Sequence, residues 1–124
     1  MRFKDKVCFV TGGGSGIGAA ISEVLAEEGA RVAILSRSAP DADWLARLGA
    51  DFIAVELSDD AACRAAVETL RQRHGAVYGL VNNAGAIFDR REVTVDGIER
   101  TWALDHLGYV LLTLELLDLL AASG

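Results

Sequence analysis

Short apolar runs alternate along the chain with segments whose apolar residues recur at helical spacing. The first run, Val7–Val10, contains β-branched residues and stops at a glycine-rich turn, which is typical of a strand buried on both faces of a parallel sheet. From Ile17 onward apolar residues recur every three or four positions, and Gly29 stands where a glycine commonly ends a helix. The pattern predicts a strand, a turn and a helix in succession.

Further apolar runs predict three more strands, over residues Val32–Leu35, Phe52–Leu57 and Val77–Val81. Helical segments separate them, and strands that alternate with helices form parallel sheets with right-handed crossovers. The predicted fold class is therefore α/β with a parallel sheet, in one domain over residues 1–124.

The helices between these strands have recognisable ends. Pro40 suits the first turn of a short helix that Gly49 ends. Ser58 or Asp59 can cap a longer helix that runs to about His74, where a glycine follows.

A long helix is predicted for the last part of the chain. Asp96 and Glu99 resemble a capping box, and apolar positions follow almost to the end. The stretch Tyr109–Ala122 is rich in leucine but is interrupted by Thr113, Glu115 and Asp118, and it is shorter than the ~20 apolar residues of a membrane span. We therefore expect a buried or partner-facing helix and no membrane span.

Composition narrows the class of protein. The net charge is −6 and no basic cluster stands out, which disfavours a nucleic-acid surface. Cys8 and Cys63 fall in a predicted strand and helix, outside any CxxC or metal-ligand cluster, so we expect no metal site and a reducing compartment. The apolar run after the basic N-terminus is too short for a signal peptide, and the expected location is cytoplasmic.

The turn after the first strand, TGGGSGIG (Thr11–Gly18), carries the clearest chemistry. Its glycines follow the spacing G-x-x-x-G-x-G through Gly12, Gly16 and Gly18. Glycines allow close approach to the backbone, and a helix N-terminus offers unpaired N–H groups and partial positive charge, which suits a phosphate. The alternative is a tight turn that binds nothing.

The end of the second strand bears on the choice of nucleotide. An acidic residue there would hold the ribose 2′-hydroxyl of NAD, but the chain has Ser36 followed by Arg37. A guanidinium can pair with a 2′-phosphate, so the predicted cofactor is NADP, with NAD as the alternative.

A second motif, LVNNAG (Leu80–Gly85), ends the fourth strand. TGGGSGIG and NNAG together resemble the short-chain dehydrogenase/reductase family, and the segment Thr94–Thr113 is most similar to its retinol-dehydrogenase-like members. The resemblance covers essentially the whole chain. It implies a Rossmann-type doubly wound sheet, incomplete here, with strand order 3-2-1-4 plus a long interface helix.

The resemblance also implies which residues touch the cofactor. The pyrophosphate would be lined by Gly12, Ser15, Gly16, Ile17 and Gly18, and the adenosine by Asn83, Ala84 and Gly85, while Asn82 and Asn83 would brace the sheet. Where the family has an Asp that contacts adenine, this chain has Glu56, followed by Leu57.

Asp105 stands where the family places a catalytic Asn on the interface helix. An Asp can accept the same hydrogen bonds but cannot donate from an amide, and it adds a negative charge. For the neighbouring His106 we expect packing or hydrogen bonding rather than acid–base catalysis.

The Ser and the Tyr-x-x-x-Lys that the family uses for catalysis are not among these residues. Tyr78 and Tyr109 are followed four residues later by Asn82 and Thr113. We therefore expect the catalytic part to be absent and this chain alone to be inactive. We also expect the fourth strand to lie at a sheet edge, and self-association through the helix around residues 96–121.

Three hypotheses about function remain at this level. The leading one is the NADP-binding portion of a reductase that, when complete, transfers hydride between NADP(H) and a carbonyl or alcohol substrate. The alternative is a natural, non-catalytic dinucleotide-binding sensor or interaction module, which Asp105 favours slightly. The third is a remnant whose turn holds no ligand.

Overall fold

Four parallel strands form one sheet in the order β3-β2-β1-β4 in the computed structural model, which describes residues 1–86 and 90–123. The elements in chain order are β1 (Val7–Thr11), α1 (Gly16–Glu27), β2 (Arg31–Ser36), α2 (Ala42–Leu48), β3 (Asp51–Ala54), α3 (Asp60–His74), β4 (Gly79–Val81), α4 (Arg100–Trp102), a π-helical segment (Ala103–Leu107) and α5 (Gly108–Ser123). The predicted fold class and strand order are confirmed.

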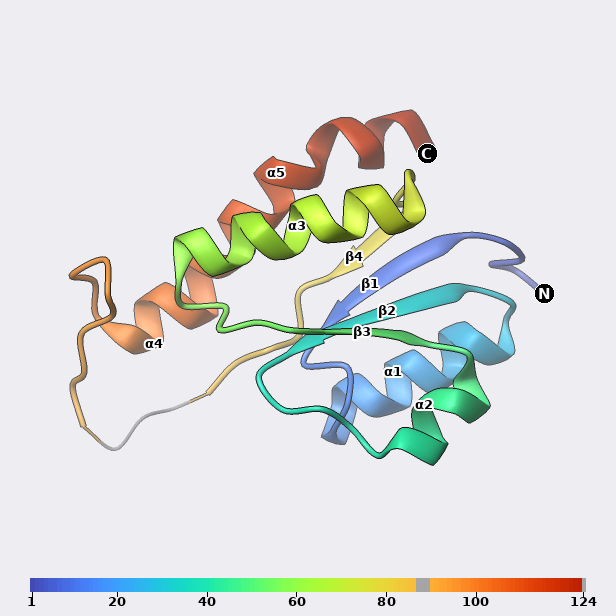
Figure 1. Cartoon of the computed structure of the whole chain (residues 1–124), viewed down its shortest axis with the longest axis horizontal. Coiled ribbons are helices and arrows are strands. Elements are labelled where there is room, and N and C mark those ends of the chain that lie inside the picture. Colours follow the sequence, from blue (N-terminus) through green and yellow to red (C-terminus); the bar gives the residue numbers. More distant parts are fainter. Residues whose placement is uncertain (87–89, 124) are drawn as a thin grey trace.

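Helices cover both faces of the sheet (Figure 1), with α1 and α2 on one face and α3 and α5 on the other. Successive side chains of a strand point to opposite faces of the sheet, so each face forms its own hydrophobic core with the helices that cover it. Phe9 and Leu35 belong to the cluster shared with α3 and α5, whereas Val10 and Ile34 belong to the cluster shared with α1 and α2. All four side chains are fully buried, and each such burial contributes about 1.5–3 kcal/mol to stability.

β1 extends one residue beyond its predicted range at one end, β2 extends one residue beyond it at both ends, and the other two strands differ more. β3 begins one residue earlier than predicted and ends at Ala54, yet Val55 and Leu57 beyond it are still buried. β4 begins at Gly79, although Val77 before it is also buried. An apolar run indicates burial, but a strand also needs a neighbour with which to form a hydrogen-bonded ladder, and the ladder covers only part of each run.

The predicted boundaries of α2 and α3 are largely confirmed. Asp59 caps α3 by accepting a hydrogen bond from the Ala62 N–H at 3.2 Å, and Gly49 ends α2 in the left-handed conformation. The prediction for Pro40 was wrong: it precedes the helix, because Asp41 is the N-cap and α2 begins at Ala42.

The last helix begins later than predicted. The prediction of a capping box at Asp96 was wrong. Gly97, at φ +77°, is not in a helical conformation, and the Asp96 carboxylate instead accepts from the Asp60 N–H at the start of α3. Glu99 is the N-cap, and its carboxylate accepts from the N–H groups of Thr101 and Trp102. These backbone hydrogen bonds hold the pKa of Glu99 below its ordinary value.

α5 packs on α3 and on the core through one side only. Leu112 and Leu116 are buried, whereas Leu114 and Leu117 on the other side are 63% and 53% exposed. Arg71 of α3 holds Asp118 of α5 in an ion pair of 2.6 Å. The leucine-rich helix is thus half core and half exposed apolar surface.

Among the described residues, the helix Arg100–Ser123 is long and apolar enough to cross a membrane, judged by its length and composition alone. The leucine-rich stretch Tyr109–Ala122 is only part of this continuous helix of 24 residues. Core helices of soluble proteins pass the same test, so this is a weak indication. The absence of a membrane span stays a prediction.

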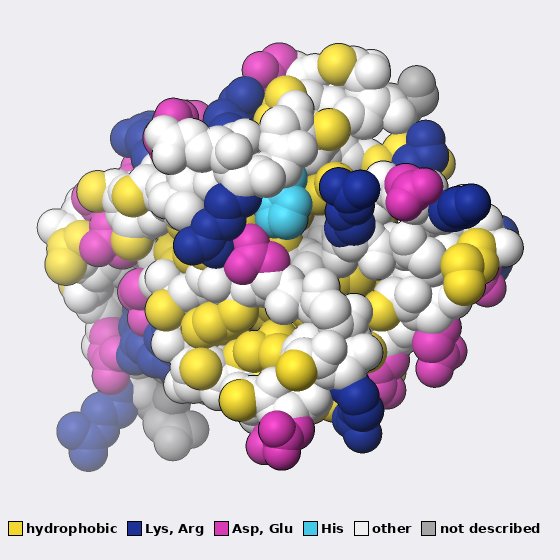
Figure 2. Space-filling model, turned by 45° about the vertical axis from the view of Figure 1, so that its right-hand side comes forward, with side chains coloured by type: hydrophobic (Ala, Val, Ile, Leu, Met, Phe, Trp, Pro, Cys, Tyr) yellow, Lys and Arg dark blue, Asp and Glu magenta, His cyan; other side chains and the backbone are white. Residues whose placement is uncertain are grey.

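Charged side chains of both signs are interspersed on the face shown in Figure 2. Cys8 and Cys63 are free thiols inside the core, as predicted. His74 lies 3.1 Å from the Asp51 carboxylate and packs edge-on against Phe9, which is a structural role.

Candidate functional site

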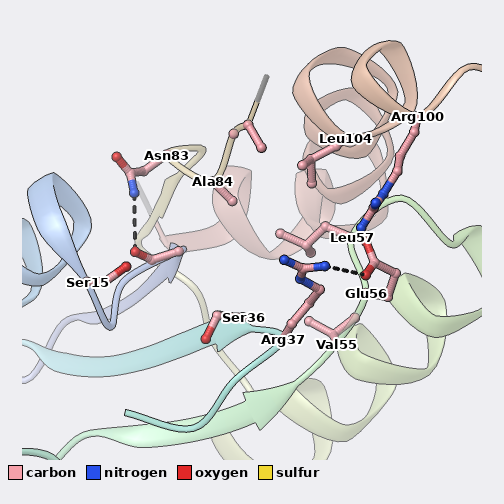
Figure 3. A pocket seen from close by; sticks show the side chains of 13 residues that line it. Ser15, Ser36, Arg37, Val55, Glu56, Leu57, Asn83, Ala84, Arg100 and Leu104 are labelled. Atoms are coloured by element: carbon pink, nitrogen blue, oxygen red, sulfur yellow. Dashed lines mark hydrogen bonds and ion pairs between the residues drawn. The ribbon is translucent and has the colours of Figure 1, made fainter. Parts of the chain in front are cut away.

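A cavity of about 290 Å³ opens at the carboxyl ends of the strands (Figure 3). Every strand contributes to it, because parallel strands bring the loops that follow them to one edge of the sheet. The cavity lies beside the point where the chain changes direction across the sheet, between β1 and β4. Its lining comprises Gly12, Ser15, Ser36, Arg37, Val55, Glu56, Leu57, Asn83, Ala84, Gly85, Ala86, Arg100 and Leu104.

The glycines of the β1–α1 turn have separate tasks. A Cβ at Gly18 would collide with the Gly12 carbonyl oxygen and approach Asn83 Nδ2 to 2.5 Å, so Gly18 allows close packing. Gly16 has φ +54° and no described atom within 4 Å of its would-be Cβ, so it leaves open space at the start of α1. Among the described residues Ser15 makes no side-chain capping hydrogen bond to α1, which leaves this helix N-terminus suited to an anion.

Thr11 fixes the loop after β4 against the turn after β1. Its hydroxyl oxygen accepts from the N–H groups of Asn83 and Ala84, both at 2.9 Å, and its hydroxyl lies 3.3 Å from the Val81 carbonyl. Asn83 Nδ2 in turn donates to the carbonyls of Thr11 and Gly12, at 3.1 and 3.3 Å. The two glycine-containing motifs therefore form one hydrogen-bonded unit, and Asn83 has the bracing role that was predicted.

Asn82 joins the same loop to α5. Its Nδ2 donates to Thr113 Oγ1 at 3.2 Å, while its Oδ1 is buried and has no hydrogen-bond partner among the described residues. This amide ties the loop to α5 through one of its two ends, whereas the predicted role was to brace the sheet.

Asp105 lies in the π-helical segment and points to the loop. Its Oδ1 accepts a hydrogen bond from the Ala86 N–H at 3.0 Å, and one turn later the Tyr109 hydroxyl donates to the Ala84 carbonyl. Burial and the nearby Asp105 charge raise the pKa of Tyr109. The helix thus holds the cavity wall at two points.

Charged groups stand at one rim of the cavity. The Arg37 guanidinium lies 3.8 Å from Glu56 Oε2, and Glu56 Oε1 also accepts from the Ser58 hydroxyl at 2.7 Å. Arg100 reaches toward the same rim from α4 and pairs with Glu92 at 2.7 Å. The rim therefore presents two guanidinium groups and one carboxylate to a ligand.

The structure brings most of the predicted site residues together. The cavity is lined by Gly12, Ser15, Ser36, Arg37, Glu56, Leu57, Asn83, Ala84 and Gly85. Gly16, Ile17 and Gly18 lie beside it at the start of α1, and Ile17 is 76% exposed. Asp105 touches the loop behind the cavity and is not among its lining residues.

Four lining residues were missed by the sequence analysis: Val55, Ala86, Arg100 and Leu104. Val55 and Ala86 are neighbours of predicted residues and could have been included. Arg100 and Leu104 lie on the last helix, and only the position of the start of that helix beside the cavity brings them there.

His106 stacks on Trp102, with the ring centroids 4.4 Å apart, and is exposed. This contact agrees with the predicted packing role. In the described part of the chain no three His, Cys, Asp or Glu residues come close enough together to hold a metal ion.

A doubly wound α/β fold with a cavity at its topological switch point defines a broad class of ligand-binding proteins. A family model described as short chain dehydrogenase matches residues 6–124. The chain belongs to the short-chain dehydrogenase family.

Known proteins resemble the chain in sequence and structure. Retinol dehydrogenase 12 of Mus musculus is 34% identical over 132 residues, which cover 100% of this chain and 42% of the relative. The structure of the Pseudomonas aeruginosa RhlG/NADP active-site complex has a TM-score of 0.81 and 31% identity, and covers 100% of this chain and 52% of that one. An NADH-dependent reductase complexed with NAD has a TM-score of 0.84 and 27% identity, over 98% and 54%. The chain spans about 40% of the length of the curated relatives it matches.

Proposed function

We propose that the cavity binds a nicotinamide dinucleotide and that this chain is the cofactor-binding part of an oxidoreductase. The observation that carries the proposal is the joining of the β1–α1 turn, Arg37 and the Asn83–Gly85 loop around one cavity. Solved structures that this chain resembles contain NADP in one case and NAD in another, which supports the class of ligand.

The start of α1 would hold the pyrophosphate. Gly16 leaves the space open, Gly12 lets the Asn83–Ala84 loop pack closely beside the turn, and the helix dipole favours negative charge. The adenosine would lie against Ala84 and Leu104, which both line the cavity (Figure 3).

We propose NADP as the preferred form, because Arg37 is the residue after β2 and lines the cavity. A guanidinium is positively charged, so it attracts a phosphate and pairs well with it. NAD stays the alternative, because the chain resembles proteins that bind either form.

In a complete protein the bound nicotinamide ring would supply or accept a hydride at a carbonyl or alcohol carbon. The residues of this chain would bind and orient the cofactor, and Asp105 and Tyr109 would hold the cavity wall. The family's Ser and Tyr-x-x-x-Lys are not among the 124 residues, so the chain alone should bind without turnover.

Calorimetric titration of the chain with NADPH and with NADH tests the proposal. We expect saturable binding of both, tighter for NADPH, and no oxidation of NADPH with carbonyl substrates. Arg37→Ala should weaken NADPH by about tenfold, the loss of one phosphate ion pair, and should leave NADH nearly unchanged. A folded chain that binds neither nucleotide would overturn the proposal, and an unchanged preference in Arg37→Ala would overturn the NADP assignment.

We further propose that copies of the chain associate through the exposed side of α5, where Leu114 and Leu117 form an apolar surface.

We also propose a reducing, cytoplasmic location, which the two buried free thiols support. Fractionation of cells that make the protein would test the location.

A further inference from the structure

Glu56 divides its carboxylate between two neighbours at the cavity rim. Oε1 accepts from the Ser58 hydroxyl at 2.7 Å, and Oε2 lies 3.8 Å from the Arg37 guanidinium (Figure 3). The family resemblance assigned this position to an adenine contact. Both carboxylate oxygens already have partners within the chain. One of these partners is Arg37, the residue proposed to hold a 2′-phosphate.

The pairing of Arg37 with Glu56 follows from the sheet. β2 and β3 are parallel neighbours with Ser36 opposite Ala54, so the residues that follow the two strands emerge side by side. Arg37 comes directly after β2, and Glu56 follows β3 within two residues. The longer side chain of Glu, compared with Asp, extends the reach of the carboxylate toward the guanidinium.

The pair is too weak to serve as a structural bond. The Arg37 side chain is 63% exposed and that of Glu56 is 37% exposed, and the two are 3.8 Å apart. Exposed pairs of this kind contribute little to stability and open readily. Its effect is local: a negative charge stands beside the cation that an incoming phosphate would need.

We propose that Glu56 is a specificity-determining residue that competes with the 2′-phosphate of NADP for Arg37. The inference rests on the proposed dinucleotide site. A ribose 2′-phosphate carries between one and two negative charges near neutrality and is repelled by the carboxylate. The 2′-hydroxyl of NAD is neutral and can donate a hydrogen bond to the same carboxylate, so Glu56 narrows the preference for NADP that Arg37 creates.

Arg100 does not remove this competition. It lines the same rim but its guanidinium is held by Glu92 at 2.7 Å, so a second carboxylate already engages the second cation. The charged side chains that line the cavity are Arg37, Glu56 and Arg100. Neutralising Glu56 therefore raises the positive charge of the cavity directly beside Arg37.

The test compares dissociation constants for NADPH and NADH at low ionic strength in the full chain, Glu56→Gln, Arg37→Ala and the double variant. We expect Glu56→Gln to tighten NADPH by about tenfold and to change NADH by less than about twofold. In the Arg37→Ala background, Glu56→Gln should tighten NADPH binding by a smaller factor, because the guanidinium for which the carboxylate and the phosphate compete is gone. Added salt should reduce the gain.

Glu27→Gln is the matched control. It removes the same charge from an exposed position at the far end of α1, and it should leave both affinities unchanged. If Glu56→Gln does not fold, Glu56→Asp keeps the charge with a shorter reach and should tighten NADPH by a smaller factor.

Three results would overturn the inference. Equal weakening of NADPH and NADH in Glu56→Gln would make Glu56 an adenine acceptor or a support for the loop. Unchanged affinities for both nucleotides in Glu56→Gln would show that the carboxylate does not compete. Failure of the folded, unsubstituted chain to bind either nucleotide would instead remove the proposed function, and this inference with it.

Discussion

The Asp105 carboxylate accepts a hydrogen bond from the Ala86 backbone N–H at 3.0 Å, across the gap between the last helix and the loop after β4. The contact depends on a π-helical turn, in which the Gly108 N–H bonds the Ala103 carbonyl five residues earlier. A Cβ at Gly108 would lie 2.9 Å from the Leu57 carbonyl oxygen, so a glycine lets this turn pass close to the cavity wall. By the family resemblance a catalytic Asn is expected at this position, and the Asp that stands here keeps an acceptor oxygen.

Replacing Asp105 should separate acceptor from charge. We expect Asp105→Ala to lower the free energy of unfolding by about 1–2 kcal/mol, because the Ala86 N–H loses its partner. Asp105→Asn keeps an oxygen acceptor and should stay within about 0.5 kcal/mol of the original. Urea denaturation followed by circular dichroism measures both. Equal losses in the two variants would show that the charge, and not the acceptor, matters.

Gly18→Ala should destabilise the chain far more than Gly49→Ala. The added Cβ at Gly18 meets the Gly12 carbonyl oxygen in a packed turn, which should cost about 3 kcal/mol. Gly49 has φ +63° with no described atom near its would-be Cβ, so only backbone strain of about 1 kcal/mol applies. Thermal unfolding gives the comparison, and similar losses would contradict the assigned close approach.

The thiol of Cys63 should resist alkylation in the folded chain. Burial, aided by the charges of Asp60 and Asp59, raises its pKa to about 12, so about one molecule in ten thousand carries the thiolate at pH 8. Burial also raises the pKa of Cys8. Iodoacetamide at pH 8 should modify neither cysteine rapidly, whereas in denaturant both should react. Rapid modification of one thiol in the folded chain would contradict the buried assignment.

The same shift fixes the sign of a pH effect. Cys63 binds its proton more tightly in the folded state than in the unfolded state, whose pKa is near 9.0. Its contribution to stability is therefore complete below about pH 9 and is lost as the pH rises toward 12. Cys63→Ala should flatten the alkaline loss of stability between those values, and an unchanged pH dependence would contradict this source.

Self-association through α5 should be weakened by charges on its exposed side. We expect Leu114→Glu combined with Leu117→Glu to shift the chain toward the monomer in sedimentation velocity, with little change in unfolding, because both side chains are exposed. Val95→Glu, at a position 82% exposed and outside the helix, is the control. A monomeric parent chain would contradict the proposed association.

Local chemistry in the sequence determined much of this protein. The glycine spacing of the first turn, the cap at Asp59 and the left-handed glycines at the ends of α2 and α3 depend on neighbours a few residues away, so they could be predicted. The family resemblance then supplied the strand order and most of the cavity lining. The predicted capping box at Asp96 does not form. Gly97 has a positive φ that keeps a helix from starting here, and the Asp96 carboxylate accepts from the distant Asp60 N–H instead.

Only the tertiary structure decided the relations between distant segments. Arg37 and Glu56 pair because β2 and β3 lie in a particular register, and Arg100 and Leu104 reach the cavity because the start of the last helix lies beside it. The π-helical turn that aims Asp105 at Ala86 likewise depends on packing against Leu57. Hydrophobic periodicity records which face of an element is buried, but not which partner buries it, because many partners satisfy the same pattern.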